Sequence, residues 1–410
     1  SQLANSSTSS FFYPSVGLSG VISEMIQMPS FIDYMKVRGS FSSVGMPYPR
    51  NLTSPTYEYN EATQSWKPKT HYPIGDLKPE RTDSWEVGLD MKLFKDFNLG
   101  LSWYLANTFN QTFDPQISVS SGYTTIYLQT GYVRNTGLEL SLGYGHTWNN
   151  NFRWDSNFTL SHNKNKIKEL VRDYVHPETG ELINKDRLDV GGLGKARFIL
   201  KEGGTLGDLY TQSDLKRDDN GMVDIDPTGI VAIENNLPDI KLGSVFPKAN
   251  LAWSNHFSWK GISLSALFTA RIGGIVYSAT EAAMDQYGVS ERSALARDNG
   301  GVLVNNRTLV DAQNYYTTIG SESGLPQYYT YNATNVRLQE ASIGYLIPRK
   351  WLGNVCDIQV SVIGRNLWMI YNKAPFDPES VATTDNYYQG IDYFMLPSTR
   401  NIGFNVKINF

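Results

Sequence analysis

Cysteine and histidine are scarce in this sequence. Cys356 is the only cysteine in 410 residues, so the chain has no disulfide framework and no metal site built from several thiolates. The five histidines show no HxxxH spacing and no pairing with a cysteine ligand. The motifs of the common zinc sites are therefore missing, and we expect neither a metal nor another cofactor.

Long apolar runs and charge are also missing. No stretch of about 18 consecutive apolar residues occurs, which excludes a bundle of transmembrane helices. Charged residues make up 19% of the chain, below the ~25% that is usual for soluble domains. The net charge of −4 gives no electrostatic basis for binding nucleic acid. The first residues, SQLANSSTSS, lack the charged and apolar regions of a signal peptide.

Aromatic residues and glycine are abundant instead, with 13% aromatic residues, 25 Tyr among them, and 35 Gly. Apolar and polar residues alternate along many segments, and Gly100 between Leu99 and Leu101 is one example. Such alternation indicates strands of a β-sheet whose two faces differ. It is clearest at 85–91, 97–103, 138–144, 152–160, 262–268 and 402–410.

Eleven long strands are predicted from this pattern and from the turn residues between them. Many are longer than the globular average of about 5–6 residues and suit a tilted bilayer crossing. They lie near 10–23, 32–45, 83–94, 97–110, 132–147, 152–165, 248–259, 261–274, 332–346, 357–371 and 398–410.

The connections between these strands alternate in length. Tight turns fall at Lys95–Asp96, Asn149–Asn151 and Lys260–Gly261, and moderate connections at 24–31 and 347–356. The long connections lie near 46–82, 111–131, 166–247, 275–331 and 372–397. Short periplasmic turns and long extracellular loops are typical of outer-membrane barrels, whereas a soluble β-sandwich gives no reason for this rhythm. We therefore predict an all-β fold, an antiparallel transmembrane β-barrel.

Two finer features agree with a barrel. Trp and Tyr cluster near the predicted strand ends, as aromatic girdles would, although strands in general favour aromatic residues. They are Trp103, Tyr104, Trp148, Trp154, Trp253, Trp259, Trp368 and Tyr371. In 335–345 the apolar positions shift parity after Leu338, so we expect a β-bulge near Glu340.

No catalytic constellation can be assembled from the sequence. It contains no GxSxG elbow and no Walker-type loop, and we predict that the chain is not an enzyme. The run Asp218–Gly221 resembles a calcium loop, but that frame places Lys216 and Pro227 where carboxylates are required. We interpret the run as a hairpin turn within a long loop.

A series of motifs resembles the C-terminal region of the SusC/RagA family of TonB-dependent outer-membrane transporters of Bacteroidetes. The motifs occur in the family's order. They are RTDSWEVGLDMKLF at 81–94, YVRNTGLELSL at 132–142, SHNKNKIKEL at 161–170, RDDNGMVDID at 217–226, FTARIGG at 268–274, NVRLQEASIGYLIP at 335–348, VIGRNLWMIY at 362–371 and QGIDYFMLPSTRNIGFNVKINF at 389–410.

The resemblance implies a barrel of about 22 strands around an N-terminal plug, the size class with a plugged lumen. Residues 1–410 would then be the C-terminal part, about half of that barrel, without the plug and the N-terminal strands. An odd number of strands cannot close an antiparallel barrel, so we expect the remaining strands and the start of the exported protein to lie upstream.

By the same resemblance, the intact protein sits in the outer membrane of a Gram-negative bacterium and imports oligosaccharides or peptides. A SusD-like surface lipoprotein would cover its mouth, and TonB–ExbB–ExbD would supply energy through the absent N-terminal part. The alternatives are a passive porin without energy coupling and an outer-membrane enzyme, for which no site is visible.

Candidate substrate contacts are polar and aromatic loop residues, because aromatic faces stack on sugar rings and on peptide side chains. They are Tyr287, Tyr315, Tyr316, Tyr328, Tyr329, Tyr387 and Tyr388. The alternative is that these rings pack loop against loop or against the lipoprotein. Arg271 and Arg365 are expected to point into the lumen, paired with carboxylates or bound to substrate. At the C-terminus, the alternating residues resemble a signal for barrel assembly, and they are Phe404, Val406, Ile408 and Phe410.

Overall fold

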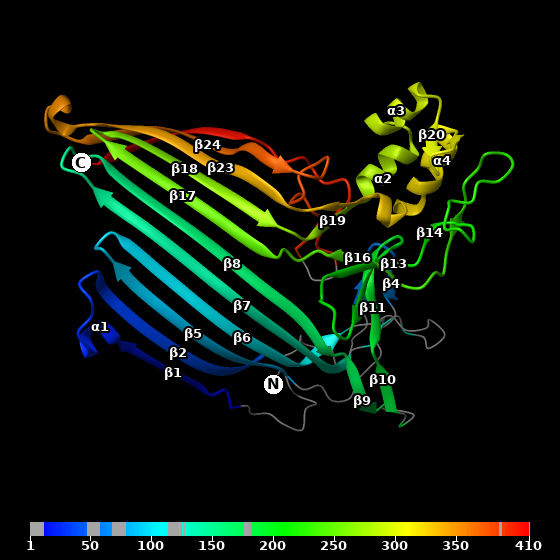
Figure 1. Ribbon diagram of the computed structural model, residues 1–410, viewed down its shortest axis with the longest axis horizontal. Helices are drawn as coiled ribbons and strands as arrows, with labels where there is room; N and C mark the ends of the chain where they lie inside the picture. The colour runs from blue at the N-terminus through cyan, green and yellow to red at the C-terminus, as the bar shows by residue number, and fades with distance from the viewer. Residues whose placement is uncertain are drawn as a thin grey trace.

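One large antiparallel sheet dominates the computed structural model of the protein (Figure 1). The structure describes residues 12–46, 58–67, 79–113, 123, 125–126, 128–175, 180, 182–384 and 388–409. The sheet has eleven strands, and each is hydrogen-bonded to the next. In spatial order they are β1 (Ser15–Val21), β2 (Ile32–Met46), β5 (Glu80–Leu93), β6 (Phe97–Phe113), β7 (Leu128–Thr147), β8 (Arg153–Glu169), β17 (Ala249–Trp259), β18 (Ile262–Ile272), β23 (Asn335–Ile347), β24 (Asp357–Asn372) and β26 (Asn401–Asn409). This order confirms the predicted set of eleven strands.

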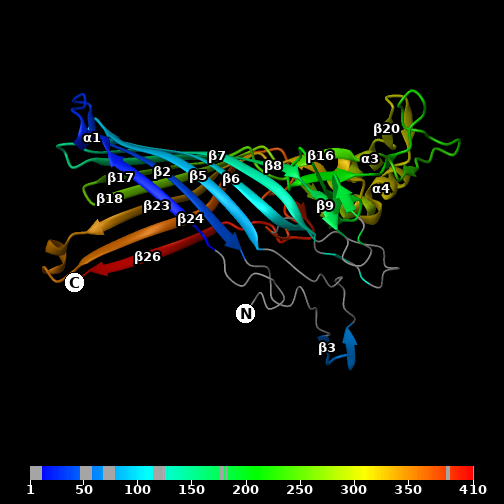
Figure 2. The ribbon, with the colours of Figure 1, turned by 90° about the horizontal axis from the view of Figure 1, so that it is seen from below.

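The sheet is curved, and its two outermost strands, β1 and β26, are open edges (Figures 1 and 2). The short connections gather at one end of the strands, the turn end, and the long connections at the other, the loop end. The alternation predicted from sequence is therefore confirmed. Among the described residues, no helix is both long and apolar enough to cross a bilayer.

Local residue chemistry makes the turn end tight. The β17–β18 hairpin turns through Lys260 and Gly261, whose φ angles of 48° and 88° match the left-handed turns that suit twisted hairpins. Phe94 and Lys95 between β5 and β6 also have positive φ, at 51° and 65°. The two remaining wider connections at this end carry α1 (Ile22–Met25) and a short 3₁₀ helix, η4 (Arg349–Leu352).

Cross-strand pairing separates an apolar face from a polar face. On the apolar face, directly opposed residues form a continuous row across the strands. They are Met91, Leu99, Leu142, Phe158, Trp253, Phe268, Leu338 and Trp368. Several are wide open, with Leu142 43%, Trp253 45% and Trp368 59% exposed. A soluble protein would bury such a surface, whereas lipid accepts it.

The opposite row is polar. It runs from Lys92 through Asn98, Gly143 and Asn157 to Ser254. These residues line a broad open trough on the polar face of the sheet. The alternation of apolar and polar faces predicted from sequence is thus confirmed for the described strands.

The predicted bulge lies in β23 beside Glu340. Leu267 pairs with Glu340, but its neighbour Phe268 pairs with Leu338, so Gln339 is left over. The same shift occurs against β24, where Leu338 faces Trp368 and Glu340 faces Arg365. The extra residue keeps the apolar residues before and after it on one face, as expected for a bulge.

Glycines on the polar face leave room for long side chains that lie flat on the sheet. A Cβ atom at Gly137 would overlap the ring of Tyr104, its cross-strand partner. A Cβ atom at Gly88 would likewise overlap the guanidinium group of Arg38. Arg38 crosses the sheet there to pair with Glu86 at 3.1 Å. Small residues beneath large ones therefore keep the trough open.

Trp148, Trp154 and Trp259 lie at the turn end, where aromatic rings contact one another across strands. Trp103 and Trp253 lie further along β6 and β17. On the apolar face the indole N–H of Trp253 donates to Ser156 Oγ at 3.0 Å, so the polar group has a partner. The girdle assignment stays a prediction, and the turn end is the part of the sheet that suits it.

Single cysteines on the two faces are expected to react differently with a membrane-impermeant thiol reagent. In the full-length protein freed of native cysteines, Asn98→Cys and Gly100→Cys should be labelled from the wet lumen, while Leu99→Cys and Leu101→Cys should be protected by lipid. Gly100 accepts a side chain, because a Cβ there would meet its neighbours at 3.7 and 3.8 Å. Strong labelling at 99 and 101 with protection at 98 and 100 would reverse the faces.

Candidate functional site

The long connections pack into one folded unit at the loop end, which we call the loop module. It comprises the described residues of 170–248, 273–334 and 373–400. Its strands are β9 (Val171–Val175), β10 (Leu182–Lys185), β11 (Arg187–Leu193), β12 (Ala196–Lys201), β13 (Asp208–Thr211), β14 (Asp214–Leu215), β15 (Ile233–Glu234), β16 (Ile240–Ser244), β19 (Ile275–Ser278), β20 (Val302–Val304), β21 (Thr308–Val310), β22 (Thr330–Asn332) and β25 (Ile391–Asp392). Its helices are α2 (Ala279–Gln286), α3 (Glu291–Asp298), α4 (Ala312–Gly320), and the 3₁₀ turns η2 (Ser321–Ser323) and η3 (Pro326–Tyr328). A separate hairpin, β3 (Glu58–Asn60) with β4 (Ser65–Lys67), lies in the β2–β5 connection.

The main hydrophobic core of the described residues lies in the loop module rather than in the sheet. Phe198, Leu209, Tyr277 and Tyr329 are 0% exposed and belong to one cluster. Phe113 on β6 joins the same cluster, because β6 runs past its predicted end at 110. The long loops thus form a folded unit with a fixed surface, rather than a set of independent flexible loops.

Three short helices form the outer part of the loop module (Figure 1). Each begins at a side-chain cap: Ser278, Ser290 and Asp311 accept hydrogen bonds from the N–H of Glu281, Ser293 and Asn314 respectively. Caps of this kind start a helix because they satisfy amide donors that have no partner in the first turn. They are the local signal for helices in a region that the sequence analysis treated only as loop.

Asp285 on α2 is the buried polar centre of this helical part. Its side chain is 0% exposed and lies 2.5 Å from the Arg292 guanidinium. Its oxygens also accept hydrogen bonds from the Ser290 hydroxyl at 2.5 Å and the Tyr329 hydroxyl at 2.9 Å. The Arg292 guanidinium in turn lies 4.8 Å from the centre of the Tyr329 ring. Burial and the nearby Asp285 carboxylate raise the pKa of Tyr329, so its hydroxyl stays a donor.

The predicted substrate tyrosines fall into three groups. Tyr287 and Tyr388 are 77% and 47% exposed, so their rings are open to a ligand. Three are half-buried against the core of the loop module, and they are Tyr315, Tyr316 and Tyr328. Tyr329 is fully buried, so contact with a substrate would require the helices to open. Tyr387 lies outside the described residues. Direct binding by any of them stays a prediction.

Two of these tyrosines meet in one pocket between the helices. The pocket has a volume of about 300 Å³ and contains Tyr287, Tyr316 and polar groups from all three helices. Its lining is Asp285, Gln286, Tyr287, Gly288, Ser293, Arg297, Ala312, Gln313 and Tyr316. Aromatic edges beside amide and guanidinium donors suit a small polar group such as a sugar ring or a peptide side chain.

The two predicted arginines both lie on the polar face, in different settings. Arg365 faces Glu340 directly across the β23–β24 pair, and the ion pair measures 2.8 Å with the Arg365 side chain 68% exposed. Arg271 donates from Nη2 to the backbone oxygen of Val245 at 2.7 Å. Arg271 therefore holds the β16–β17 connection against the sheet. Its hydrogen-bond partner among the described residues is this backbone carbonyl, and its pairing with a carboxylate of the plug or barrel stays a prediction.

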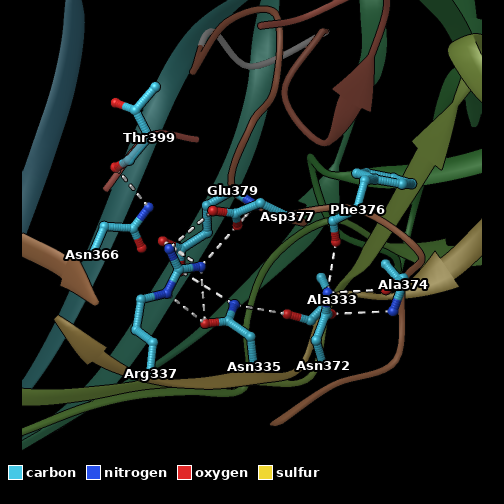
Figure 3. A network of polar contacts seen from close by, with 10 residues as sticks. All are labelled: Ala333, Asn335, Arg337, Asn366, Asn372, Ala374, Phe376, Asp377, Glu379 and Thr399. Carbon is cyan, nitrogen blue, oxygen red and sulfur yellow. Dashed lines mark hydrogen bonds and ion pairs between the residues drawn. The ribbon is translucent and has the colours of Figure 1, made fainter. Parts of the chain in front are cut away.

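Sequence reasoning missed a buried polar network, which is centred on Arg337 of β23 (Figure 3). The Arg337 side chain is 5% exposed and makes two hydrogen bonds to Asp377, at 2.8 and 3.1 Å. It also contacts Glu379 at 3.2 Å and Asn335 Oδ1 at 3.1 Å. Burial alone would raise the pKa of Asp377, but the hydrogen bonds from Arg337 and from the Glu379 amide lower it below its ordinary value. The network fixes the start of the 373–400 loop to the polar face.

Neighbouring amides extend this attachment. Asn372 Nδ2 donates to the backbone oxygens of Ala374 and Phe376, at 2.9 and 2.6 Å. Asn366 Nδ2 donates to Thr399 O at 3.2 Å, at the far end of the loop (Figure 3). Parity could have placed Arg337 on the polar face, because its neighbours Val336 and Leu338 are apolar. Its acidic partner Asp377 lies 40 residues away, and no local pattern connects the two.

A second ion pair closes the β11–β12 hairpin onto the rest of the loop module. Asp239 lies 2.6 Å from Arg187 and 2.9 Å from Lys201, and its side chain is 7% exposed. The hydrogen bond from Arg187, with that from Lys201, holds the pKa of Asp239 at about 2, although burial opposes the shift. The carboxylate therefore stays ionised at any physiological pH.

The run at 218–221 forms the predicted turn. Asp218 Oδ1 accepts from the amides of Asn220 and Met222, both at 2.9 Å, and Arg217 bridges to Val223. The Asp218 carboxylate thus stabilises the turn by accepting hydrogen bonds from backbone amides. Among the described residues, no three His, Cys, Asp or Glu side chains are grouped to hold a metal ion.

The residues of the predicted assembly signal lie on the edge strand β26. Phe404, Val406 and Ile408 are 81%, 59% and 48% exposed on one face of that strand. Phe410 lies outside the described residues. Their alternation agrees with the prediction, and their role in assembly stays a prediction.

Comparison with known proteins identifies several relatives of this chain. Residues 2–208 match the family model "TonB dependent receptor-like, beta-barrel". The chain is 25% identical to TonB-dependent receptor P3 of Formosa agariphila over 372 residues, which cover 82% of this chain and 35% of that protein. It is 24% identical to TonB-dependent receptor P26 of the same organism, over 97% of this chain and 42% of that protein.

Solved structures share the fold. The structure of the RagAB peptide importer in the open-open state matches with a TM-score of 0.70 and 17% identity, over 99% of this chain and 43% of the matched chain. A second structure, of the RagAB peptide transporter, gives a TM-score of 0.70 and 19% identity. The resemblance to SusC/RagA transporters seen in the motifs is confirmed at the level of fold. The chain spans less than half the length of each of these relatives.

The family model covers half of the chain, and the eleven-stranded sheet with short turns at one end and folded loops at the other agrees with it. The family is one of outer-membrane receptors rather than a family of enzymes. The chain belongs to the TonB-dependent receptor-like β-barrel family.

Proposed function

We propose that the chain is the C-terminal part of a TonB-dependent importer in the outer membrane of a Gram-negative bacterium. The observation that carries the proposal is the eleven-stranded sheet, with an apolar face, a polar face and two open edges. In lipid, each unpaired backbone group on an open edge costs several kcal/mol, so such a sheet needs the rest of a closed barrel. The remaining strands and a plug would come from the protein outside these residues.

The loop module would then lie outside the cell, above the lumen. A SusD-like lipoprotein would dock on this surface and hold oligosaccharides or peptides over the trough. The exposed Tyr287 and Tyr388, with the pocket between the helices, offer rings and hydrogen-bonding groups for either substrate. The RagAB peptide importer has a related fold, but a shared fold does not select a substrate.

Energy would reach the transporter from TonB–ExbB–ExbD through the part of the protein outside this chain. The polar side chains of the trough, Arg38, Glu86 and Asp90 among them, would face the plug and the passing substrate. A passive porin would share the sheet and the loops, and it differs in needing no energy coupling.

Uptake through the full-length protein is expected to depend on TonB. Cells would be supplied with fluorescent oligosaccharides and peptides, and uptake of the true substrate should fall to that of a receptor-deletion strain when TonB is absent. A strain that lacks only the lipoprotein serves as the control for capture at the surface. Uptake that is unchanged without TonB would contradict the proposal and indicate a porin.

A further inference from the structure

Four large apolar side chains stand exposed on the segment that leads into the edge strand β26. They are Tyr393, Phe394, Met395 and Leu396, at 51%, 61%, 39% and 86% exposure. The rings of Tyr393 and Phe394 touch edge to face, with centroids 5.1 Å apart, but this contact leaves both half open. Clusters of exposed apolar residues mark surfaces that another molecule or chain covers.

The segment is fixed at both ends, so its exposure is not that of a free tail. Before it, Asp392 in the buried strand β25 accepts a hydrogen bond from the Ser278 hydroxyl at 2.6 Å. β25 itself pairs with β19 in parallel. After it, Thr399 O accepts from Asn366 Nδ2 at 3.2 Å. The four side chains are therefore presented from a defined place beside the sheet.

The backbone at Phe394 is held in an unfavourable conformation. Its φ angle is +53°, in the left-handed region that bulky residues avoid. Its N–H donates to Thr280 Oγ1 at 2.7 Å, which holds the residue in this conformation. Strain of this kind persists at sites where the orientation of the side chain serves a contact.

The neighbouring edge indicates what covers the segment. Every residue of β26 is exposed, and within the described part of the chain β26 pairs with β24 alone, so one row of its backbone groups has no described strand beside it. We propose that Tyr393–Leu396 is a docking surface for the part of the same polypeptide whose strand closes the barrel against β26. This inference rests on the proposed function, because only a closed barrel brings that strand to this edge. The partner would be the loop-side end of an antiparallel strand with apolar side chains at the junction.

Photo-crosslinking in outer membranes tests the contact. p-Benzoylphenylalanine is placed at Phe394 or Leu396 of the full-length protein, and the crosslinked peptides are identified by mass spectrometry. We expect crosslinks within one polypeptide, to peptides outside the present 410 residues. Tyr287, which is also exposed but lies on the helices, is the matched position and should not give them. Crosslinks from 394 and 396 only to lipid, to a separate lipoprotein or to residues within the 410 would overturn the proposal.

A crosslinker at Asn405, in the middle of β26, separates this inference from the proposed function. If Asn405 crosslinks to a strand outside the 410 residues while 394 and 396 do not, the barrel stands and the docking surface is wrong. If Asn405 also fails, the closed barrel itself is contradicted. As a second readout, Leu396→Asp should lower the fraction of heat-modifiable folded barrel, whereas Leu303→Asp, at a site 57% exposed on β20, should not. Equal yields of folded barrel for Leu396→Asp and the wild type would also count against the docking surface.

Discussion

Replacement of Arg337 by methionine is expected to release the 373–400 loop from the sheet, at a cost of about 3–5 kcal/mol. The side chains of Arg337 and Asp377 are only 5% and 8% exposed, so loss of the guanidinium leaves a buried carboxylate without its partner. Glu379 and Asn335 lose hydrogen bonds at the same time. Limited proteolysis of intact cells, followed by mass spectrometry, should show new cleavage between 373 and 400 while the barrel stays heat-modifiable.

Arg365→Met is the matched control, because it removes the same group from the neighbouring strand. Arg365 also pairs with a carboxylate, Glu340, but its side chain is 68% exposed, and such pairs contribute about 0–1 kcal/mol. The triple variant Arg337→Met, Asp377→Leu, Glu379→Gln should recover part of the loss, since no buried charge is then left unpaired. Equal cleavage of the Arg337 and Arg365 variants would show that burial is not what makes the Arg337 network strong.

Asp285→Ala is expected to unfold the three helices of the loop module locally. The Asp285 side chain is fully buried and binds Arg292, Ser290 and Tyr329 together. Its removal leaves the Arg292 charge and two hydroxyl donors without an acceptor, which costs about 3–5 kcal/mol. Hydrogen exchange of backbone amides in 279–320 should become faster by roughly 100-fold or more, since each 1.4 kcal/mol is a factor of ten.

Asp311→Ala supplies the control within the same unit. Asp311 caps α4 by accepting the Asn314 N–H at 2.9 Å, and it is exposed. Loss of such a cap costs about 1 kcal/mol, so exchange should change by roughly tenfold at most. The amides of β6 and β7 should be protected equally in both variants, because the ladder of the sheet is untouched. If exchange in 279–320 stays at the wild-type rate in Asp285→Ala, the cluster does not stabilise the helices.

The sheet could be predicted because its determinants are local. Period-two alternation fixes which residues share a face, and Lys260–Gly261 fixes a tight hairpin, so register follows from short stretches of sequence. Even the bulge at Gln339 was visible as a parity shift around Glu340. The loop-side ends of β5, β6, β7 and β8 were underestimated. β6 and β8 continue into the core of the loop module, where burial of Phe113 and Ile167 replaces alternation as the determinant.

The loop module could not be predicted in the same way. Its helices are short, and their caps at Ser278, Ser290 and Asp311 are common residues in any loop. Its core forms between segments that are far apart in the chain, so residues adjacent in sequence can differ widely in burial. Tyr328 is half-buried and Tyr329 wholly buried, although sequence analysis gave both the same role. Arg337 was missed for the same reason, because its structural role depends on contacts with Asp377 in a distant loop.

The shared core of the loop module also constrains the order of assembly. Its buried residues come from three separate connections, for example Leu209, Tyr277 and Ile391, and strands of the large sheet lie between them in the chain. No single connection can complete this core by itself. If the loop module lies outside the cell as proposed, each loop crosses the membrane as an extended chain, and the core can form only after the last of these connections has crossed. A mutation that stabilised one loop too early, before its translocation, would be expected to stall biogenesis rather than to improve the protein.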